Sequence, residues 1–170
     1  AFDISPTNWG SLIDPFNGRS DLQRHSIRSL HEFSFIDDPT RIFRAIRYSE
    51  RLGFKIAPPT MNEIERNSSY IKNLSSDRII TELKKIYAES KVNDILSSAN
   101  ELGIMGKIHS ALQWNDSHAN GMNQTLAQNI LPSDAFLVIT GYLLKATDQI
   151  DELSERITNS SWSRELLRQA

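Results

Sequence analysis

Four arginines follow one aspartate at helical spacing near residue 40. Asp38 precedes Arg41, Arg44, Arg47 and Arg51, and steps of three or four residues place side chains on one face of an α-helix. Four like charges on one face repel one another, and arginines in the first turn also oppose the helix dipole. The pattern therefore predicts a surface that binds a polyanion. A solvated helix face is the alternative that composition leaves open.

Asp38 and Arg41 form a sharper feature within that pattern. An ionised carboxylate only accepts hydrogen bonds, and a guanidinium only donates them. Side by side, they match a base edge that carries an exocyclic amine next to an unprotonated ring nitrogen, as cytosine and adenine do. Uracil and guanine would leave buried polar groups facing like partners, so the pair predicts selection of C and A. The alternative is that Asp38 caps the helix and Arg41 forms an intrahelical ion pair with Asp37 or Asp38.

The elements that position these residues are predicted to be helical. Asp38-Pro39 supplies an N-cap followed by a proline at the first helical position, and Gly53 ends the helix. Between them an apolar stripe is built by Ile42, Ala45, Ile46 and Leu52.

Further helices are predicted along the rest of the chain. One runs from Thr60, after Pro58-Pro59, to the break at residues 67–69, and another from Ser75 or Ser76 to Glu89. Amphipathic segments follow near 91–102, 104–113, 121–130, 134–146, 148–158 and 162–170. Short links between them predict an antiparallel helical array, and the fold class is mainly α.

The first thirty residues predict a short β-hairpin instead. Residues 9–14 are a strand candidate, Pro15-Phe16-Asn17-Gly18 is a turn cluster, and residues 26–30 could return as the second strand. A lone hairpin is marginal in water, so we expect it to be the remnant of a larger sheet.

Composition excludes several classes of protein. The 170 residues include no Cys and carry a net charge of −2, which excludes a disulfide scaffold and favours a reducing, cytoplasmic setting. No apolar run is long enough to span a membrane, and the first residues are no signal peptide. The chain lacks an initiator Met, so we expect a piece of a longer protein.

Ordered motifs run through the first half of the chain. They are Leu12-Ile13-Asp14-Pro15-Phe16-Asn17-Gly18, Asp21-Leu22, Ile27-Arg28, the run from Phe35 to Arg47, Arg51-Leu52-Gly53-Phe54, and Leu74-Ser75-Ser76-Asp77-Arg78-Ile79 with Glu82-Leu83. Together these motifs resemble the class II tRNA nucleotidyltransferase and poly(A) polymerase family. Asn17 stands where the family commonly has Gly. The resemblance implies three regions: a remnant of the catalytic head in residues 1–30, a base-selecting neck in 31–90, and part of a helical body in 91–170.

The same resemblance implies roles for individual residues. Asp38 and Arg41 would hold the Watson–Crick edge of an incoming CTP or ATP, with Arg44 and Arg47 also contacting the nucleotide. Asp77, Arg78 and Glu82 would brace the neck helices. Asp14 and Asp21 would belong to the segment that links head and neck, where Asp21 would influence switching between C and A.

The catalytic machinery of that family is not recognisable in this chain. The family binds Mg²⁺ through an Asp-x-Asp pair, and the sequence contains no Asp-x-Asp triplet. No catalytic or metal-binding residue is therefore assigned, and the four histidines, His25, His31, His109 and His118, show no metal-ligand spacing.

The sequence predicts part of an enzyme that adds CCA, CC, A or a poly(A) tail to the 3′ end of tRNA or another RNA. Mg²⁺ would be the cofactor, and ATP and CTP would be the substrates. No interaction with a membrane is expected. The chain alone is expected to be inactive. The alternative is a helical RNA-binding or protein-interaction module without catalysis, and a helical phosphohydrolase is disfavoured by the missing His-Asp pair.

Overall fold

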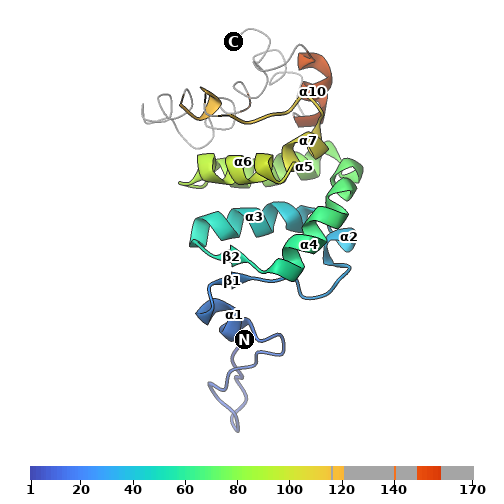
Figure 1. Ribbon diagram of the computed structural model, residues 1–170. Coiled ribbons are helices and arrows are strands. Elements are labelled where there is room, and N and C mark those ends of the chain that lie inside the picture. The colour runs from blue at the N-terminus through green and yellow to red at the C-terminus, as the bar shows by residue number, and fades with distance from the viewer. Residues whose placement is uncertain (116, 121–139, 141–148, 158–170) are drawn as a thin grey trace.

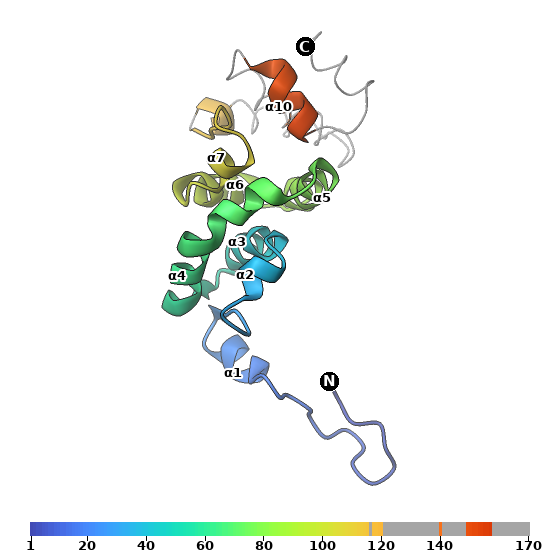
Figure 2. The ribbon, with the colours of Figure 1, turned by 90° about the vertical axis from the view of Figure 1, so that its right-hand side faces the viewer.

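The computed structural model describes residues 1–115, 117–120, 140 and 149–157. The helices form a stack with α1 at one end and α10 at the other (Figures 1 and 2). The elements are α1 Gly18–Gln23, β1 Ser26–Ile27, α2 Ser34–Asp37, α3 Thr40–Leu52, β2 Lys55–Ile56, α4 Pro58–Asn67, η1 Ser68–Asn73, α5 Ser76–Tyr87, α6 Val92–Glu101, α7 Ile104–Ile108 and α10 Ile150–Ile157. The predicted mainly α fold is confirmed.

The predicted helix after Asp38 is α3. It begins at Thr40, one residue later than expected, because Pro39 forms its N-cap. Gly53 ends it with a φ of 66°, a left-handed conformation that glycine adopts without a steric penalty. The apolar stripe is buried as predicted, whereas Leu52 at the end of the helix is exposed.

The next two predicted helices are α4 and α5. Helix α4 begins at Pro58 rather than Thr60, since its two prolines occupy the first turn, where a backbone N–H is not needed. The predicted break at residues 67–69 is the start of the 3₁₀ helix η1, which leads into α5. Three short elements, α1, α2 and η1, have no counterpart among the predicted helices.

The predicted hairpin is wrong. Strand β1 pairs with β2 in parallel, with Ser26 opposite Lys55 and Ile27 opposite Ile56. Leu12 instead forms an isolated antiparallel bridge with Phe2. Part of the predicted turn region continues as helix α1, because the Asp14 carboxylate accepts hydrogen bonds from the backbone N–H groups of Gly18 and Arg19 at 2.8 and 2.9 Å. These acceptors satisfy donors that the first turn of a helix leaves free.

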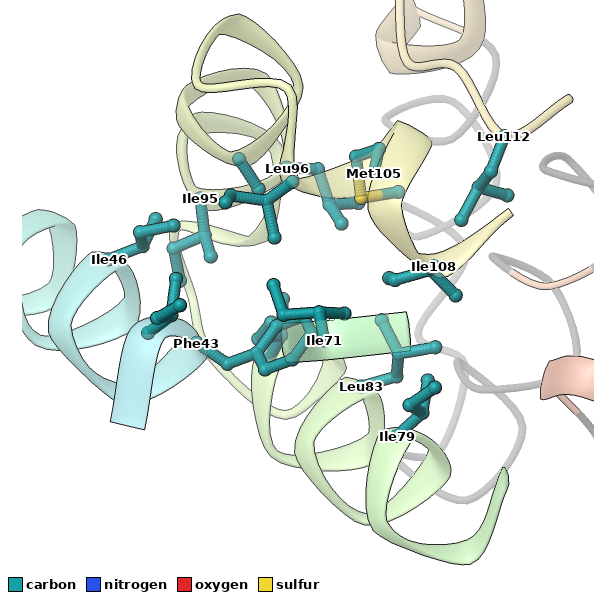
Figure 3. Packing of buried hydrophobic residues seen from close by; sticks show 14 of the residues in the cluster. Phe43, Ile46, Ile71, Ile79, Leu83, Ile95, Leu96, Met105, Ile108 and Leu112 are labelled. Carbon is teal, nitrogen blue, oxygen red and sulfur yellow. The ribbon is translucent and has the colours of Figure 1, made fainter. Parts of the chain in front are cut away.

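One apolar cluster holds the stack together (Figure 3). Phe43 and Ile46 of α3 belong to it together with Ile95 and Leu96 of α6 and Leu83 of α5. It continues through η1 and α7 to α10, so buried residues between 35 and 157 share one core. The core fixes α3, and with it Asp38 and the arginines, against two later helices.

Some expectations are not tested by this structure. The predicted helices at 121–130, 134–146 and 162–170 lie outside the described residues, Thr140 excepted. The predicted boundaries at residues 30 and 90 stay predictions, and the apolar cluster runs across the second of them.

Candidate functional site

Asp38 lies at the start of α3 and is bonded through one oxygen only. Its Oδ1 accepts hydrogen bonds from the Thr40 N–H at 3.1 Å and the Thr40 hydroxyl at 2.6 Å. The same oxygen lies 2.6 Å from Nη2 of Arg78 on α5. Within the described residues, Oδ2 accepts no hydrogen bond. The carboxylate is thus oriented by two neighbours while one oxygen stays available.

The ionisation of Asp38 reflects several opposing influences. Burial acts most strongly and raises the pKa of its carboxyl. The hydrogen bonds from Thr40 and the charges of Arg78 and Arg41 together outweigh burial and hold the pKa below its usual value. Asp38 is therefore an acceptor at neutral pH.

Arg41 is held by a different neighbour. Its Nη1 donates to the hydroxyl of Ser34 at 2.9 Å and lies 3.4 Å from the Ser34 carbonyl oxygen. Arg41 forms no ion pair with Asp37 or Asp38, so the intrahelical pair offered as the alternative is absent. Capping, the other half of that alternative, is present in the bonds from Thr40 to Asp38. Nε and Nη2 of Arg41 make no hydrogen bond within the described residues.

Arg41 and Arg44 line one pocket of about 430 Å³ beside α3. Arg28, next to β1, completes a set of three guanidinium groups in its wall, and Tyr48 and Thr60 contribute hydroxyl groups. The described lining includes no carboxylate. Arg44 has no hydrogen bond or ion pair in the described part of the chain, so the pocket combines positive charge with unused donors.

Arg47 and Arg51 line a different cleft. They share it with Lys85 and Glu89, and Nη1 of Arg47 lies 2.7 Å from Oε1 of Glu89. Arg51 reaches the same carboxylate oxygen at 3.5 Å, and the Arg47 guanidinium stacks over the ring of Tyr48. The helix face predicted from the arginine spacing is therefore divided, and the structure does not bring Arg47 together with Arg41 and Arg44. A nucleotide contact by Arg47 stays a prediction.

Asp77, Arg78 and Glu82 lie along α5 and line a small cleft with Thr40. Arg78 links α5 to the start of α3 through Asp38. Glu82 is buried and pairs with Lys85 at 2.6 Å, and the Asp77 carbonyl accepts a bond from the Thr81 hydroxyl. Arg78 is thus the residue of this group that contacts the candidate site directly, by holding Asp38.

Asp14 and Asp21 both organise the segment around α1. Asp14 caps the helix, and the N–H groups of Arg19 and Gly18 lower the pKa of its carboxyl. Asp21 pairs with Arg28 through both oxygens and also with Arg24, and the hydrogen bond from Arg28 is the main reason that the pKa of Asp21 is lowered. The sequence motifs include Arg28, but nothing local indicates that it shares a pocket with Arg41.

The described residues contain no group of three His, Cys, Asp or Glu side chains that could hold a metal ion. They therefore do not fit the Mg²⁺ that the family resemblance implies, and no chemical step is assigned to a metal here. None of the described helices is long and apolar enough to cross a membrane.

Comparison with known proteins identifies the family. A family model described as the probable RNA and SrmB-binding site of polymerase A matches residues 53–113. The A-adding tRNA nucleotidyltransferase of Geobacter sulfurreducens is 38% identical over 114 residues, which are 66% of this chain and 13% of that protein. Both comparisons support the interpretation of the chain as a fragment similar to the tRNA nucleotidyltransferase and poly(A) polymerase family. The family resemblance seen in the motifs is thereby confirmed.

Solved structures of this family share the fold along almost the whole chain. A CCA-adding enzyme in complex with ATP is 27% identical, with a TM-score of 0.84, and the match covers 98% of this chain and 43% of that one. A tRNA nucleotidyltransferase with a primer tRNA and an incoming ATP analogue is 26% identical, with a TM-score of 0.78 and coverage of 98% and 52%. The chain thus spans about half or less of the relatives that it matches.

Proposed function

We propose that this chain supplies the base-selecting part of a tRNA 3′-end nucleotidyltransferase, which adds C and A, or A alone, from CTP and ATP. Its relatives include an A-adding tRNA nucleotidyltransferase, and its structural neighbours include a CCA-adding enzyme with ATP. A neighbour with a bound primer tRNA supports an RNA 3′ end as the second substrate. A cytoplasmic location is part of the same proposal.

The observation that carries the proposal is the pair of unused atoms at the start of α3. Asp38 Oδ2 accepts no hydrogen bond, and Nε and Nη2 of Arg41 donate none, within the described residues. The other atoms of both side chains are fixed by Thr40, Arg78 and Ser34. A carboxylate acceptor and a guanidinium donor at one base edge would match cytosine and adenine. The proposal therefore requires Asp38, which does not line the pocket of Arg41 and Arg44, to reach the same base edge as Arg41. Because the protein groups are already oriented, little entropy is lost when the base binds.

Arg44 extends this arrangement along α3. It lines the same pocket as Arg41 and has no partner in the described chain, so its guanidinium is free for a charge-assisted bond to the nucleotide. Mg²⁺, which the family resemblance implies, belongs to the proposal for the whole protein, with carboxylates that are not among the described residues of this chain.

The test is nucleotide choice in the whole protein. Arg41→Ala should reduce discrimination against UTP and GTP by about ten- to a hundredfold, because each mismatched buried polar group costs about 1–3 kcal/mol in the wild type. Incorporation into tRNA is measured with each of the four nucleotides in turn. Arg66→Ala is the matched control, since Arg66 bonds only to a carbonyl of its own helix α4.

Two results would contradict the proposal. An equal loss of incorporation for all four nucleotides in Arg41→Ala would remove the base-selecting role. Unchanged selectivity in both Arg41→Ala and Asp38→Asn would exclude the start of α3 from the selection step.

A further inference from the structure

Arg28 occupies a place in the candidate pocket that the proposed function has not used. It comes from the end of β1, whereas Arg41 and Arg44 come from α3, yet all three line the same pocket of about 430 Å³. The pocket wall therefore receives positive charge from two different elements, with α2 between them in the sequence. With no carboxylate in its described lining, this pocket is suited to an anion with several negative charges.

The contacts of Arg28 fix one edge of its guanidinium and leave the other open. Nη2 and Nε lie 2.8 and 3.1 Å from Oδ2 of Asp21, and Nη2 also donates to the Phe16 carbonyl oxygen at 2.6 Å. Nη1 makes no hydrogen bond within the described residues. The side chain of Arg28 is 36% exposed, and that of Asp21 is 15% exposed. The open edge is thus accessible while the paired edge is partly shielded.

The hydroxyl groups near Arg28 are already engaged. Thr60 is buried, and its hydroxyl accepts a bond from the Ser29 N–H at 3.0 Å and lies 3.3 Å from the Ser29 hydroxyl. The Ser34 hydroxyl accepts from Arg41. The unused polar capacity of the pocket therefore lies mainly in the guanidinium groups of Arg28, Arg41 and Arg44, which are donors only.

We propose that Arg28, like Arg44, is a phosphate-binding guanidinium of this pocket and that Asp21 is the positioning residue that holds it there. This inference rests on the proposed function, since it assigns the phosphates to the polyphosphate of the incoming nucleotide. The open Nη1 of Arg28 would donate to a phosphate oxygen while Nε and Nη2 stay bonded to Asp21. Charge-assisted bonds between guanidinium and phosphate are among the stronger hydrogen bonds in proteins.

Phosphate groups also occur in the RNA backbone, so the test separates the two sources. The 170-residue chain is titrated with inorganic tripolyphosphate, ATP, adenosine and a short single-stranded RNA. Arg28→Met should weaken binding of tripolyphosphate and ATP about tenfold, which is typical of one lost charge-assisted bond, and leave adenosine and RNA binding unchanged. Arg28→Lys should restore part of the loss because it keeps the charge. Arg24→Met is the control, since Arg24 is 67% exposed and also pairs with Asp21 but does not line the pocket.

The role of Asp21 has its own readout. Asp21→Asn should lower tripolyphosphate affinity several-fold without changing the slope of log Kd against log salt, because no phosphate-binding charge is removed. Arg28→Met should reduce that slope by about one charge. Asp21→Glu should recover part of the affinity. Thermal unfolding followed by circular dichroism checks that each variant is folded.

Several outcomes would overturn the inference. Unchanged tripolyphosphate binding in folded Arg28→Met would remove Arg28 from the site, and a loss confined to RNA would assign it to the RNA backbone. Tighter binding in Asp21→Asn would show that Asp21 competes with the phosphate. A different result would separate this inference from the proposed function. If phosphate binding depends on Arg28 but the chain does not prefer CTP and ATP over UTP and GTP, the proposed function is contradicted and this inference still stands.

Discussion

Arg47 and Glu89 form an ion pair that is largely removed from water. Their side chains are only 10% and 14% exposed, and the Arg47 guanidinium also lies over the Tyr48 ring, 4.4 Å from its centroid. Burial lowers the pKa of Arg47, but the bonds to Glu89 and Tyr48 outweigh it, and the net pKa is raised. The pair ties α3 to the residues that follow α5.

Removing one partner should therefore be costly. We expect Arg47→Met to lower the free energy of unfolding by about 3 kcal/mol, because it leaves the carboxylate of Glu89 partly buried with only a distant partner. Urea unfolding of the chain measures this. Arg51→Met is the matched control: Arg51 is 54% exposed and contacts the same oxygen at 3.5 Å, so its loss should cost well under about 1 kcal/mol.

The double variant Arg47→Met with Glu89→Leu distinguishes a buried pair from a general effect of the Arg47 side chain. It should recover much of the lost stability, because no unpaired charge remains. If the double variant loses as much free energy of unfolding as Arg47→Met, or more, the broken ion pair is not the cause of the destabilisation.

The same residues show how far sequence reasoning reaches at a site. Helical spacing and the acceptor–donor chemistry of Asp38 and Arg41 are local properties, so the sequence alone indicates them. The partners are not local: Arg78 and Glu89 lie 40 and 42 residues away from Asp38 and Arg47. Arg47 pairs with Glu89, which follows α5. Strand β1, which contacts α3 and pairs with β2, places Arg28 in the pocket of Arg41 and Arg44.

At the scale of elements, helices with strong end signals were predictable and pairings between distant segments were not. Gly53, Pro58-Pro59 and Ser75 mark the limits of α3, α4 and α5 to within about two residues. The parallel pairing of β1 and β2 requires the chain to cross over through α3, and no short-range pattern reports such a crossover. Residues 26–30 had strand character, but their partner was misassigned.

Arg156 links helix α10 to the rest of the stack, in addition to the buried apolar side chains of Leu153 and Ile157. Its guanidinium donates to the carbonyl oxygens of Leu74 at 2.6 Å, Lys72 at 3.1 Å, Ile71 at 3.2 Å and Ile108 at 3.3 Å. These carbonyls belong to the ends of η1 and α7 or follow them, and the last carbonyls of a helix have no partner within it. One side chain thus satisfies acceptors from two elements.

Arg156→Met should loosen α10 and cost about 1–3 kcal/mol, because it removes a donor from partly buried carbonyl groups. Hydrogen exchange should rise in α10 and in η1 but not in α3, and protease cleavage near residue 150 should become faster. Arg66→Met is the control, since its only side-chain bond goes to Asn62 within α4. Equal exchange rates in α10 of wild type and Arg156→Met would contradict this role.

At the scale of the whole molecule, the chain combines the proposed base-selecting surface with no recognisable metal-binding carboxylates. The sequence has no Asp-x-Asp triplet. We therefore expect the 170-residue chain to bind CTP and ATP but not to transfer them. The measurement is incorporation of labelled ATP into tRNA lacking its terminal A, with the whole protein as the positive control. Incorporation by the chain alone, above the level of an Asp38→Asn variant, would refute this expectation.

The single apolar cluster has a consequence for accuracy in the proposed enzyme. Phe43 and Ile46, on the helix that carries Arg41, lie in the same core as Leu83 and Ile95 (Figure 3). Such a helix cannot shift its register or loosen without breaking the packing of α5 and α6. Errors in nucleotide choice should then not accumulate gradually on heating. Fidelity would persist until the core melts, and faithful and faulty addition would cease together.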